Sequence, residues 1–300
     1  MIDLHMHSLY SDDGEFTPEN LIFQCKEKGI HILSVTDHNC VRADSEAREA
    51  AERLGLTYLS GGEFDCTYNG RNFHMLGYGI DCGKDFFAGV ERAVESQSRR
   101  ASLEMLEKTR ALGFSVTEEE LDGLSSEEFR KGKWTGEMFG EVLLSKPEYE
   151  GHPLLAPYRE GGKRSGNPYV NIYWDFYSQG KPCYGAVTYP SMEEMIEGIH
   201  EAGGIAVLAH PGANLKGREN LLEELAVLDF DGIEVFSSYH NEIQENYFLE
   251  AAGRFGKLVT CGSDFHGKTK PAISLGEAAA HGGGRAGELT LRALKEGGIL

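Results

Sequence analysis

The sequence lacks three features that would each point to a particular class of protein. None of its six cysteines forms a Cys-x-x-Cys pair, which argues against a thiolate zinc site and fits free thiols in a reducing compartment. No stretch approaches the roughly 20 apolar residues of a membrane-spanning helix. The first residues show neither the basic nor the apolar region of a secretory leader. We therefore expect a soluble, cytoplasmic protein with no membrane partner.

Basic residues are also scarce, because 29 Lys and Arg face 48 Asp and Glu and give a formal net charge of −19. Such a charge repels polyanions at long range and argues against a broad basic track for duplex DNA. A small anionic substrate is still compatible with it, since bound cations can reverse the sign of one pocket.

What is present is an alternation of apolar runs and helical patterns. Residues 17–29 begin with Thr17 as a helix N-cap followed by Pro18, and they end at Gly29, which are typical helix boundaries. An apolar run follows at 30–36, and the same rhythm returns after Pro190. This alternation predicts parallel β/α units and an α/β fold.

Residues 84–182 do not follow this rhythm. A long helical pattern is followed by polar, Pro- and Gly-containing segments and by a group of aromatic residues. We expect a main domain at 1–83 and 183–300 and an inserted, mostly helical subdomain at 84–182 that covers the active-site face. The aromatic residues are expected to form the packing of the insert itself: Tyr169, Tyr173, Trp174, Phe176 and Tyr177.

Most of the eleven histidines follow the apolar runs directly, where parallel β/α barrels carry their active sites. The residues at these strand ends are His5, His7, His38, Glu63, His74, His210, His240, Asp264 and His266. Side chains at i and i+2 of a strand share a face, so His5 and His7 can bind one ion. Imidazole and carboxylate donors suit Zn, Mn or Fe(II) without choosing among them.

Six segments in this order resemble the motifs of the PHP (polymerase and histidinol phosphatase) superfamily: DLHMHSLYSDDGEFTP, VTDHN, GGEF, FHMLGY, AHPG and GSDFHG. They are most similar to its branch of short metal-dependent phosphoesterases that act on nucleotides or RNA ends. The resemblance implies a distorted (β/α)7 barrel with two to three divalent metal ions.

Carried over residue by residue, the resemblance implies three groups of metal ligands. The first group is His5, His7, Glu63 and Asp264. The second is Glu63, His74 and His210, and the third is Asp12, His38 and His266. Asp13 is then expected to be an inserted bystander.

The activity implied is hydrolysis of a phosphomonoester, a nucleoside phosphate or bisphosphate, or a short oligonucleotide, with a metal-bridging hydroxide as nucleophile. His240 matches a histidine of relatives and could protonate the leaving group or hold a phosphate; a packing role is equally open. Asp3 and Asp37 are expected to orient their neighbours.

The sequence differs from this branch at two places that are expected to bind phosphate. Relatives commonly carry Arg directly after A-H-P-G, where this chain has Ala213, and an R-P-H segment where it reads GKWTGEMFGEVLL. Nearby cations could substitute, with Lys133, Arg218 and Lys268 as the chosen candidates and Lys163, Arg164 and Lys216 as others. Each of them is alternatively a solvated surface charge.

Two other readings stay open. An amidohydrolase also begins with His-x-His and uses a late Asp, but it usually bridges its metals with a modified Lys where this chain offers Glu63. A non-catalytic PHP module with a regulatory role tends to lose ligands, whereas all nine positions are filled here. The phosphoesterase reading is therefore favoured.

Overall fold

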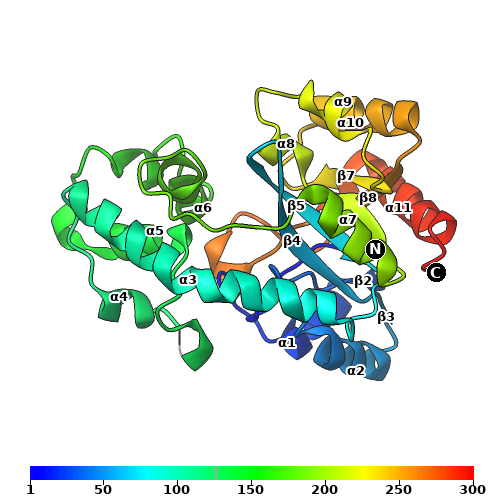
Figure 1. Cartoon of the computed structure of the whole chain (residues 1–300), viewed down its shortest axis with the longest axis horizontal. Coiled ribbons are helices and arrows are strands. Elements are labelled where there is room, and N and C mark those ends of the chain that lie inside the picture. Colours follow the sequence, from blue (N-terminus) through cyan, green and yellow to red (C-terminus); the bar gives the residue numbers. More distant parts are fainter. Residues whose placement is uncertain (126) are drawn as a thin grey trace.

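The computed structural model describes residues 1–125 and 127–300 and has an α/β architecture of two sheets flanked by helices (Figure 1). The smaller sheet is parallel, in the order β1 (Ile2–Asp3), β2 (Ile32–Leu33), β3 (Thr57–Tyr58). The larger sheet runs in the order β4 (Gly61–Tyr68), β5 (Arg71–Tyr78), β6 (Ile205–Leu208), β7 (Gly232–Ser237), β8 (Leu258–Gly262).

The larger sheet corrects the expectation of purely parallel units. β5 is antiparallel to both β4 and β6, whereas β6, β7 and β8 are parallel. Only Asn69 and Gly70 connect β4 to β5, with φ values of 48° and 75°. An Asn-Gly pair at positive φ forms a tight hairpin turn, and a parallel pair would need a crossover of a dozen residues or more.

Backbone hydrogen bonds link the two sheets at both sides. Leu4 N donates to Cys261 O at 3.2 Å, and Met6 forms a parallel bridge with Phe265. A second parallel bridge joins His38, just after β2, to Glu63 of β4. The strand ends that carry the expected ligands therefore meet along these two seams.

Helices cover the sheets on their outer faces. They are α1 (Pro18–Glu27), α2 (Asp44–Leu54), α7 (Met192–Glu201), α8 (Pro211–Asn214), α9 (Leu221–Leu225), α10 (Glu242–Phe255) and α11 (Arg285–Glu296), with short 3₁₀ turns η5 (Gly267–Thr269) and η6 (Ala278–Gly284). The N-terminus of α1 is capped as expected, because Thr17 Oγ1 accepts a hydrogen bond from Asn20 N at 3.2 Å. None of the described helices combines the length and the apolar character that a bilayer crossing requires.

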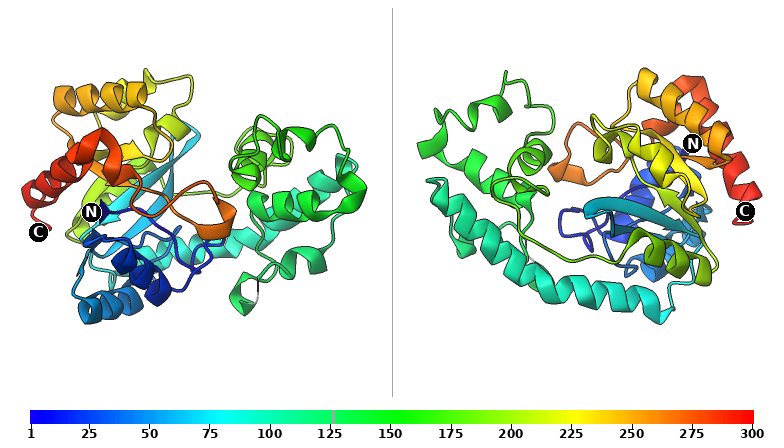
Figure 2. Two further views of the ribbon diagram at one scale, coloured as in Figure 1. Left: turned by 180° about the vertical axis from the view of Figure 1, so that it is seen from behind. Right: turned by 45° about the horizontal axis from the view of Figure 1, so that its top comes forward.

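A helical unit lies to one side of the sheets and is connected to them by the long helix α3 (Asp85–Ala111) (Figures 1 and 2). Its other elements are α4 (Glu118–Asp122), α5 (Gly136–Ser145), α6 (Pro168–Ile172), the π-turn η4 (Tyr173–Tyr177), and the 3₁₀ turns η1 (Glu128–Arg130), η2 (Pro147–Tyr149) and η3 (Ala156–Tyr158). Phe87 and Val90 of α3 are buried in the core of the larger sheet, whereas Met105 and Leu106 belong to a second core within the helical unit. The unit thus has apolar packing of its own.

Candidate metal centre

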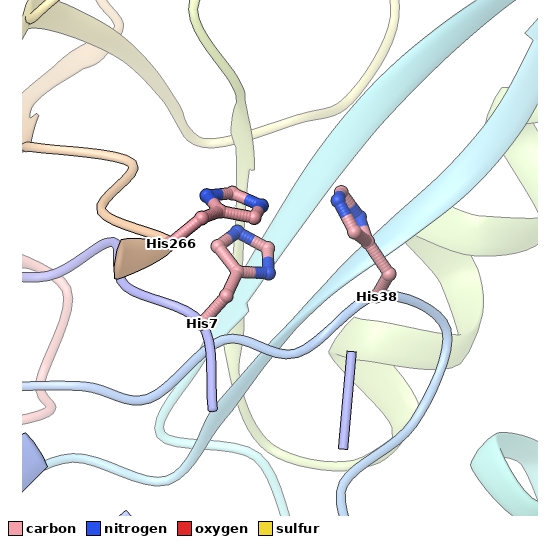
Figure 3. A group of neighbouring side chains, drawn as sticks. All are labelled: His7, His38 and His266. Carbon is pink, nitrogen blue, oxygen red and sulfur yellow. The ribbon is translucent and has the colours of Figure 1, made fainter. Parts of the chain in front are cut away.

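The strand-end residues converge on one buried cluster. Figure 3 shows His7, His38 and His266 pointing toward one another from three separate segments. The His7 ring stacks on His266 with centroids 3.8 Å apart and lies 4.4 Å from the His38 ring. Three imidazoles this close together are typical of a metal-binding or proton-transferring site.

Glu63, which is fully buried in β4, lies at the centre of the cluster. Its carboxylate oxygens are 2.8 to 3.2 Å from nitrogens of five histidines: His5, His7, His38, His74 and His210. Burial alone would raise the pKa of Glu63, but the surrounding imidazoles, His5 first, hold that pKa well below its ordinary value. Glu63 is therefore an anion shared by several imidazoles.

Three overlapping groups of donor atoms lie close enough together to hold a cation. They are His5, His7, Glu63 and Asp264; His38, Glu63 and His74; and His7, His38 and His266. The first group has the same members as the group that the sequence resemblance implies. In the second, His38 stands where His210 was expected, although His210 Nε2 is 2.8 Å from Glu63 Oε1.

The chemistry of these donors fits divalent metal ions. Six buried atoms of the cluster form no hydrogen bond of suitable geometry within the described chain: Asp13 Oδ1, His38 Nδ1, Glu63 Oε2, His210 Nδ1, Asp264 Oδ1 and His266 Nε2. A buried polar atom without such a bond costs about 1–3 kcal/mol, so six in one cluster favour a site for cations. Carboxylate with imidazole and no thiolate is a ligand set for Zn, Mn or Fe(II).

Asp13, not Asp12, lies at the third corner, which corrects the expectation for these two residues. Asp13 Oδ2 is 3.3 Å from His266 Nε2, and its Oδ1 is 4.0 Å from His38 Nε2. Burial opposes ionisation of Asp13, but the imidazoles of His266 and His38 prevail and lower its pKa to about 2. The cations that act on the Asp12 carboxyl are instead Lys133 and Arg130, while burial, with Asp13 and Glu95, raises its pKa.

The path of the loop after β1 explains why Asp13, and not Asp12, reaches the cluster. The guanidinium of Arg130, in the helical unit, donates to the carbonyls of Leu9, Ser11 and Gly14. Two tight turns, Ser11 N to Ser8 O and Gly14 N to Ser11 O, complete this loop. The resulting backbone path directs Asp13 to the cluster. The spacing of the motif after His7 does not reveal this path, so it does not identify the right aspartate.

His240 is placed for packing rather than for catalysis, which corrects the other expectation for this residue. Its Nε2 accepts a hydrogen bond from Gly212 N at 2.9 Å, and its Nδ1 lies 2.7 Å from Val235 O. Both ring nitrogens are therefore occupied by backbone. The preceding residue, Tyr239, faces the cluster and donates its hydroxyl to Asp264 Oδ2 at 2.6 Å.

Acidic residues that the sequence reasoning missed hold the outer nitrogens of the histidines. Glu234, fully buried in β7, has Oε1 at 2.9 Å from His5 Nδ1, and its Oε2 accepts from His210 N at 2.9 Å. Asp65 Oδ1 is 3.1 Å from His74 Nε2. Such carboxylates fix the ring orientation of metal-binding histidines. An acidic residue inside the apolar run GIEVF was the available signal for Glu234.

Asp3 and Asp37 act on their neighbours, as expected. Asp37 accepts hydrogen bonds from Ser8 N at 2.7 Å and from the hydroxyls of Ser8 and Ser11 at 2.6 and 2.8 Å. Ser11 Oγ in turn lies 2.9 Å from His7 Nδ1. Asp3 accepts from Ser263 N at 2.9 Å, next to Asp264. Both carboxylates thereby fix the loops that carry the cluster.

A cavity of about 1100 Å³ opens above the cluster between the sheets and the helical unit. Its walls include ligand candidates such as Asp13, His38 and Asp264, together with residues of the insert. Eight cationic side chains line it: Arg71, Lys133, Lys163, Arg164, Lys181, Lys216, Arg218 and Lys270. Two candidates from the sequence, Lys133 and Arg218, are thus at the cavity.

Lys268, the third candidate from the sequence, does not line the cavity. Its Nζ pairs with Glu141 at 3.0 Å on the surface. Lys270, two residues further along, lines the cavity instead. The aromatic residues of the insert have both roles: Tyr177 packs against Phe139 with ring centroids 5.1 Å apart, as expected, and Tyr177, Tyr173 and Trp174 also line the cavity.

Comparison with known proteins shows related sequences. A 3',5'-nucleoside bisphosphate phosphatase of Chromobacterium violaceum is 31% identical over 270 residues, which cover 88% of this chain and 87% of the relative. A phosphoribosyl 1,2-cyclic phosphate 1,2-diphosphodiesterase of Eggerthella lenta is 29% identical over 268 residues, with coverages of 89% and 94%. Both names denote enzymes that cleave phosphate esters, which agrees with the expected class.

Two solved structures are similar over most of their length. One, from Bifidobacterium adolescentis and provisionally described as a metal-dependent phosphoesterase, has a TM-score of 0.74 at 28% identity and covers 92% of this chain and 90% of that one. The other, described as an amidohydrolase from Chromobacterium violaceum with bound sulfate and no metal, has a TM-score of 0.75 at 25% identity and covers 92% of each. The PHP domain model matches residues 3–183, and the chain therefore belongs to the PHP domain family.

Proposed function

We propose that this chain is a divalent-metal-dependent phosphoesterase that hydrolyses a phosphomonoester or a nucleotide-type phosphoester. The observation that carries the proposal is the cluster centred on Glu63, whose buried donor atoms lie beside a cavity with eight cationic side chains and six carboxylates in its walls. In a chain of net charge −19, this small excess of cations is a local exception and favours an anionic ligand. The names of the relatives support the same reaction class.

The fold proposed for this function is one distorted (β/α)7 barrel built from residues 1–83 and 183–300. The bridges at Met6 and His38, which link the two sheets, support it. Residues 84–182 would then be an insert that covers the active-site face. The shared cavity, lined from both parts of the chain, supports that role.

Two to three metal ions would be held by the eight strand-end ligands together with Asp13. His5, His7, Glu63 and Asp264 would hold one ion, and Glu63 with His74 and either His38 or His210 a second. His38, His266 and Asp13 would hold a third. Such ions, when bound, supply the Lewis acidity that activates water near neutral pH and offsets phosphoryl charge.

The chain itself orients these donors. Glu234 and Ser11 contact Nδ1 of His5 and of His7, so the Nε2 atoms of both rings are directed toward Glu63 and Asp264. Tyr239 binds Oδ2 of Asp264, which leaves Oδ1 beside the two imidazoles. Rigid donors of this kind lower the reorganisation needed during the reaction.

The amidohydrolase alternative is supported by the description of one similar structure. Against it, the position central to the cluster is the carboxylate of Glu63, and the cavity is lined by eight cations. A neutral amide or lactone gains little from such a lining, whereas a phosphate gains charge-assisted hydrogen bonds. A non-catalytic module is disfavoured because each corner of the cluster keeps its donors.

The test is phosphate release by protein that has been stripped of metal and reloaded with Mn²⁺, Zn²⁺ or Fe²⁺. The panel contains phosphomonoesters, nucleoside 3',5'-bisphosphates, cyclic phosphodiesters, short oligoribonucleotides, cyclic amides and lactones. We expect hydrolysis of at least one phosphoester, which Glu63→Ala abolishes while circular dichroism stays native. His152→Ala, in the helical unit and outside the cavity lining, is the matched control. Turnover of amides or lactones alone would contradict the proposal.

A further inference from the structure

One lysine of the cavity differs from the other cations that line it. Lys270 is only 7% exposed and follows the turn η5, whereas Lys163, Lys216 and Arg218 are exposed. Two further lining cations, Lys133 and Arg164, are partly buried but are paired with Glu95 and Asp175 at 2.9 Å. Among the lining cations that the structure describes, Lys270 is the one that is buried at the cluster itself.

The position of Lys270 relative to the metal centre is fixed by Asp264. Lys270 Nζ and the Tyr239 hydroxyl both bind Asp264 Oδ2, while Asp264 Oδ1 lies 3.2 and 3.1 Å from the Nε2 atoms of His5 and His7. The ammonium group is therefore separated from the metal-binding donors by a single carboxylate. A group bound at the centre would lie within reach of it.

Lys270 has donor capacity to spare. An ammonium group carries three N–H donors, and within the described chain its Nζ makes one hydrogen bond, to Asp264. Two donors are then free for a ligand in the cavity. With low exposure, a charge-assisted hydrogen bond from them is screened less by solvent than one from a surface lysine.

The wall near Lys270 that is formed by α8 and the residues after it carries two cations, Lys216 and Arg218, and both are exposed. Lys270 Nζ lies 5.4 Å from the centroid of the Tyr239 ring, and that ring lies 5.4 Å from His210, which precedes α8. Ala213 of α8 lines the same cavity with a methyl group. A phosphate at the centre would therefore meet a buried cation at Lys270, whereas the cations on the α8 side are exposed.

We propose that Lys270 binds a phosphoryl oxygen of the substrate and is the main phosphate-binding residue of this protein. The proposal rests on the proposed phosphoesterase function and identifies a residue for it. It also explains why the loop after η5 places a buried cation beside Asp264, although the metal ligands themselves do not need one. Arginine at position 213 would reach the same cavity from the other wall and could take over part of this role.

The test uses Lys270→Met and inorganic phosphate as the probe. Phosphate affinity is measured by isothermal titration calorimetry and by competitive inhibition, on protein whose metal content is matched by elemental analysis. We expect at least a tenfold weaker phosphate Kd and a raised KM in the variant at full metal occupancy. Lys270→Arg should keep part of the affinity, and Ala213→Arg added to Lys270→Met should restore part of it.

Lys268→Met is the matched control, because Lys268 lies two residues away and pairs with Glu141 outside the cavity. It should leave the phosphate Kd unchanged. If Lys270→Met does not fold, Lys270→Gln is measured in its place. An unchanged phosphate Kd at equal metal content would overturn the proposal, and so would a loss that only follows a loss of metal, since Lys270 would then merely position Asp264.

The outcome for Lys270 is distinguishable from that for the proposed function. If the wild-type protein binds phosphate through Lys270 but hydrolyses no member of the panel, the function fails and the binding role stands. If the wild-type protein hydrolyses phosphoesters while Lys270→Met keeps the wild-type phosphate Kd, the proposed function stands and the binding role of Lys270 fails. Failure of the metal-loaded wild type to bind millimolar phosphate would overturn the proposal for Lys270 as well.

Discussion

Two adjacent aspartates show how strongly a role depends on the local path of the backbone. Asp12 and Asp13 have the same side chain, yet only Asp13 lies beside His266 and His38, while Asp12 lies near Lys133 and Arg130. Arg130 reaches this loop from 116 residues further along the chain, through its bond to the Gly14 carbonyl. A contact so distant in sequence cannot be read from the spacing of a motif.

The two aspartates therefore make a matched pair for mutation. We expect Asp13→Ala to lower kcat by at least about 100-fold, because it removes a charged donor from the cluster, with loss of up to one metal ion per chain. Asp12→Ala should lower kcat by less than about tenfold and leave the metal content unchanged. Kinetics and elemental analysis of both proteins check this, and the opposite order would restore Asp12 as the ligand.

At the scale of elements, the sequence predicts where strands end better than how strands pair. The eight strand-end residues other than His240 lie together as expected, because apolar runs followed by polar residues mark the carboxyl ends of strands. The antiparallel pairing of β4 and β5 was missed, although Asn69-Gly70 is a hairpin signal. Glu234 was missed because a buried acid inside a strand has its partner, His5, 229 residues away.

His240 joins two elements, since it binds Val235 O of β7 and Gly212 N at the start of α8. Burial lowers its pKa to about 4; Glu234 opposes this shift, while His210 and His281 reinforce it. The unfolded chain, with a histidine pKa near 6.5, thus binds a proton first as the pH falls. Stability conferred by neutral His240 is present above about pH 6.5 and is lost between there and about pH 4.

This loss should amount to at most about 3 kcal/mol in the free energy of unfolding. In urea unfolding of the metal-free protein from pH 7 to pH 4.5, we expect His240→Gln to reduce the slope of stability against pH. The variant should be less stable than the wild type at pH 7, because Gln lacks the ring that packs against Phe248 with centroids 4.8 Å apart. His152→Gln serves as the control, and a wild-type slope in His240→Gln would show that other groups cause the dependence.

At the scale of the whole molecule, the candidate metal centre joins segments from both ends of the chain. Donors from β4, from the loops after β1 and β2, and from the segment after β8 meet there, so one cluster connects residues 5 to 266. Unpaired buried donors oppose folding when they have no cation, and ions that bind only the folded state stabilise it by mass action. Metal binding and global stability should therefore be coupled.

We accordingly expect chelation to lower the melting temperature, and reloading with Mn²⁺ or Zn²⁺ to restore it. At a free metal concentration of about 100 times Kd, one bound ion contributes about 2.7 kcal/mol. Glu63→Gln should remove most of this metal-dependent increment, because Glu63 contacts five of the imidazoles. Lys268→Met should keep the increment. Calorimetry with and without chelator measures both, and equal melting temperatures in the wild type would mean that the folded chain holds no metal at this centre.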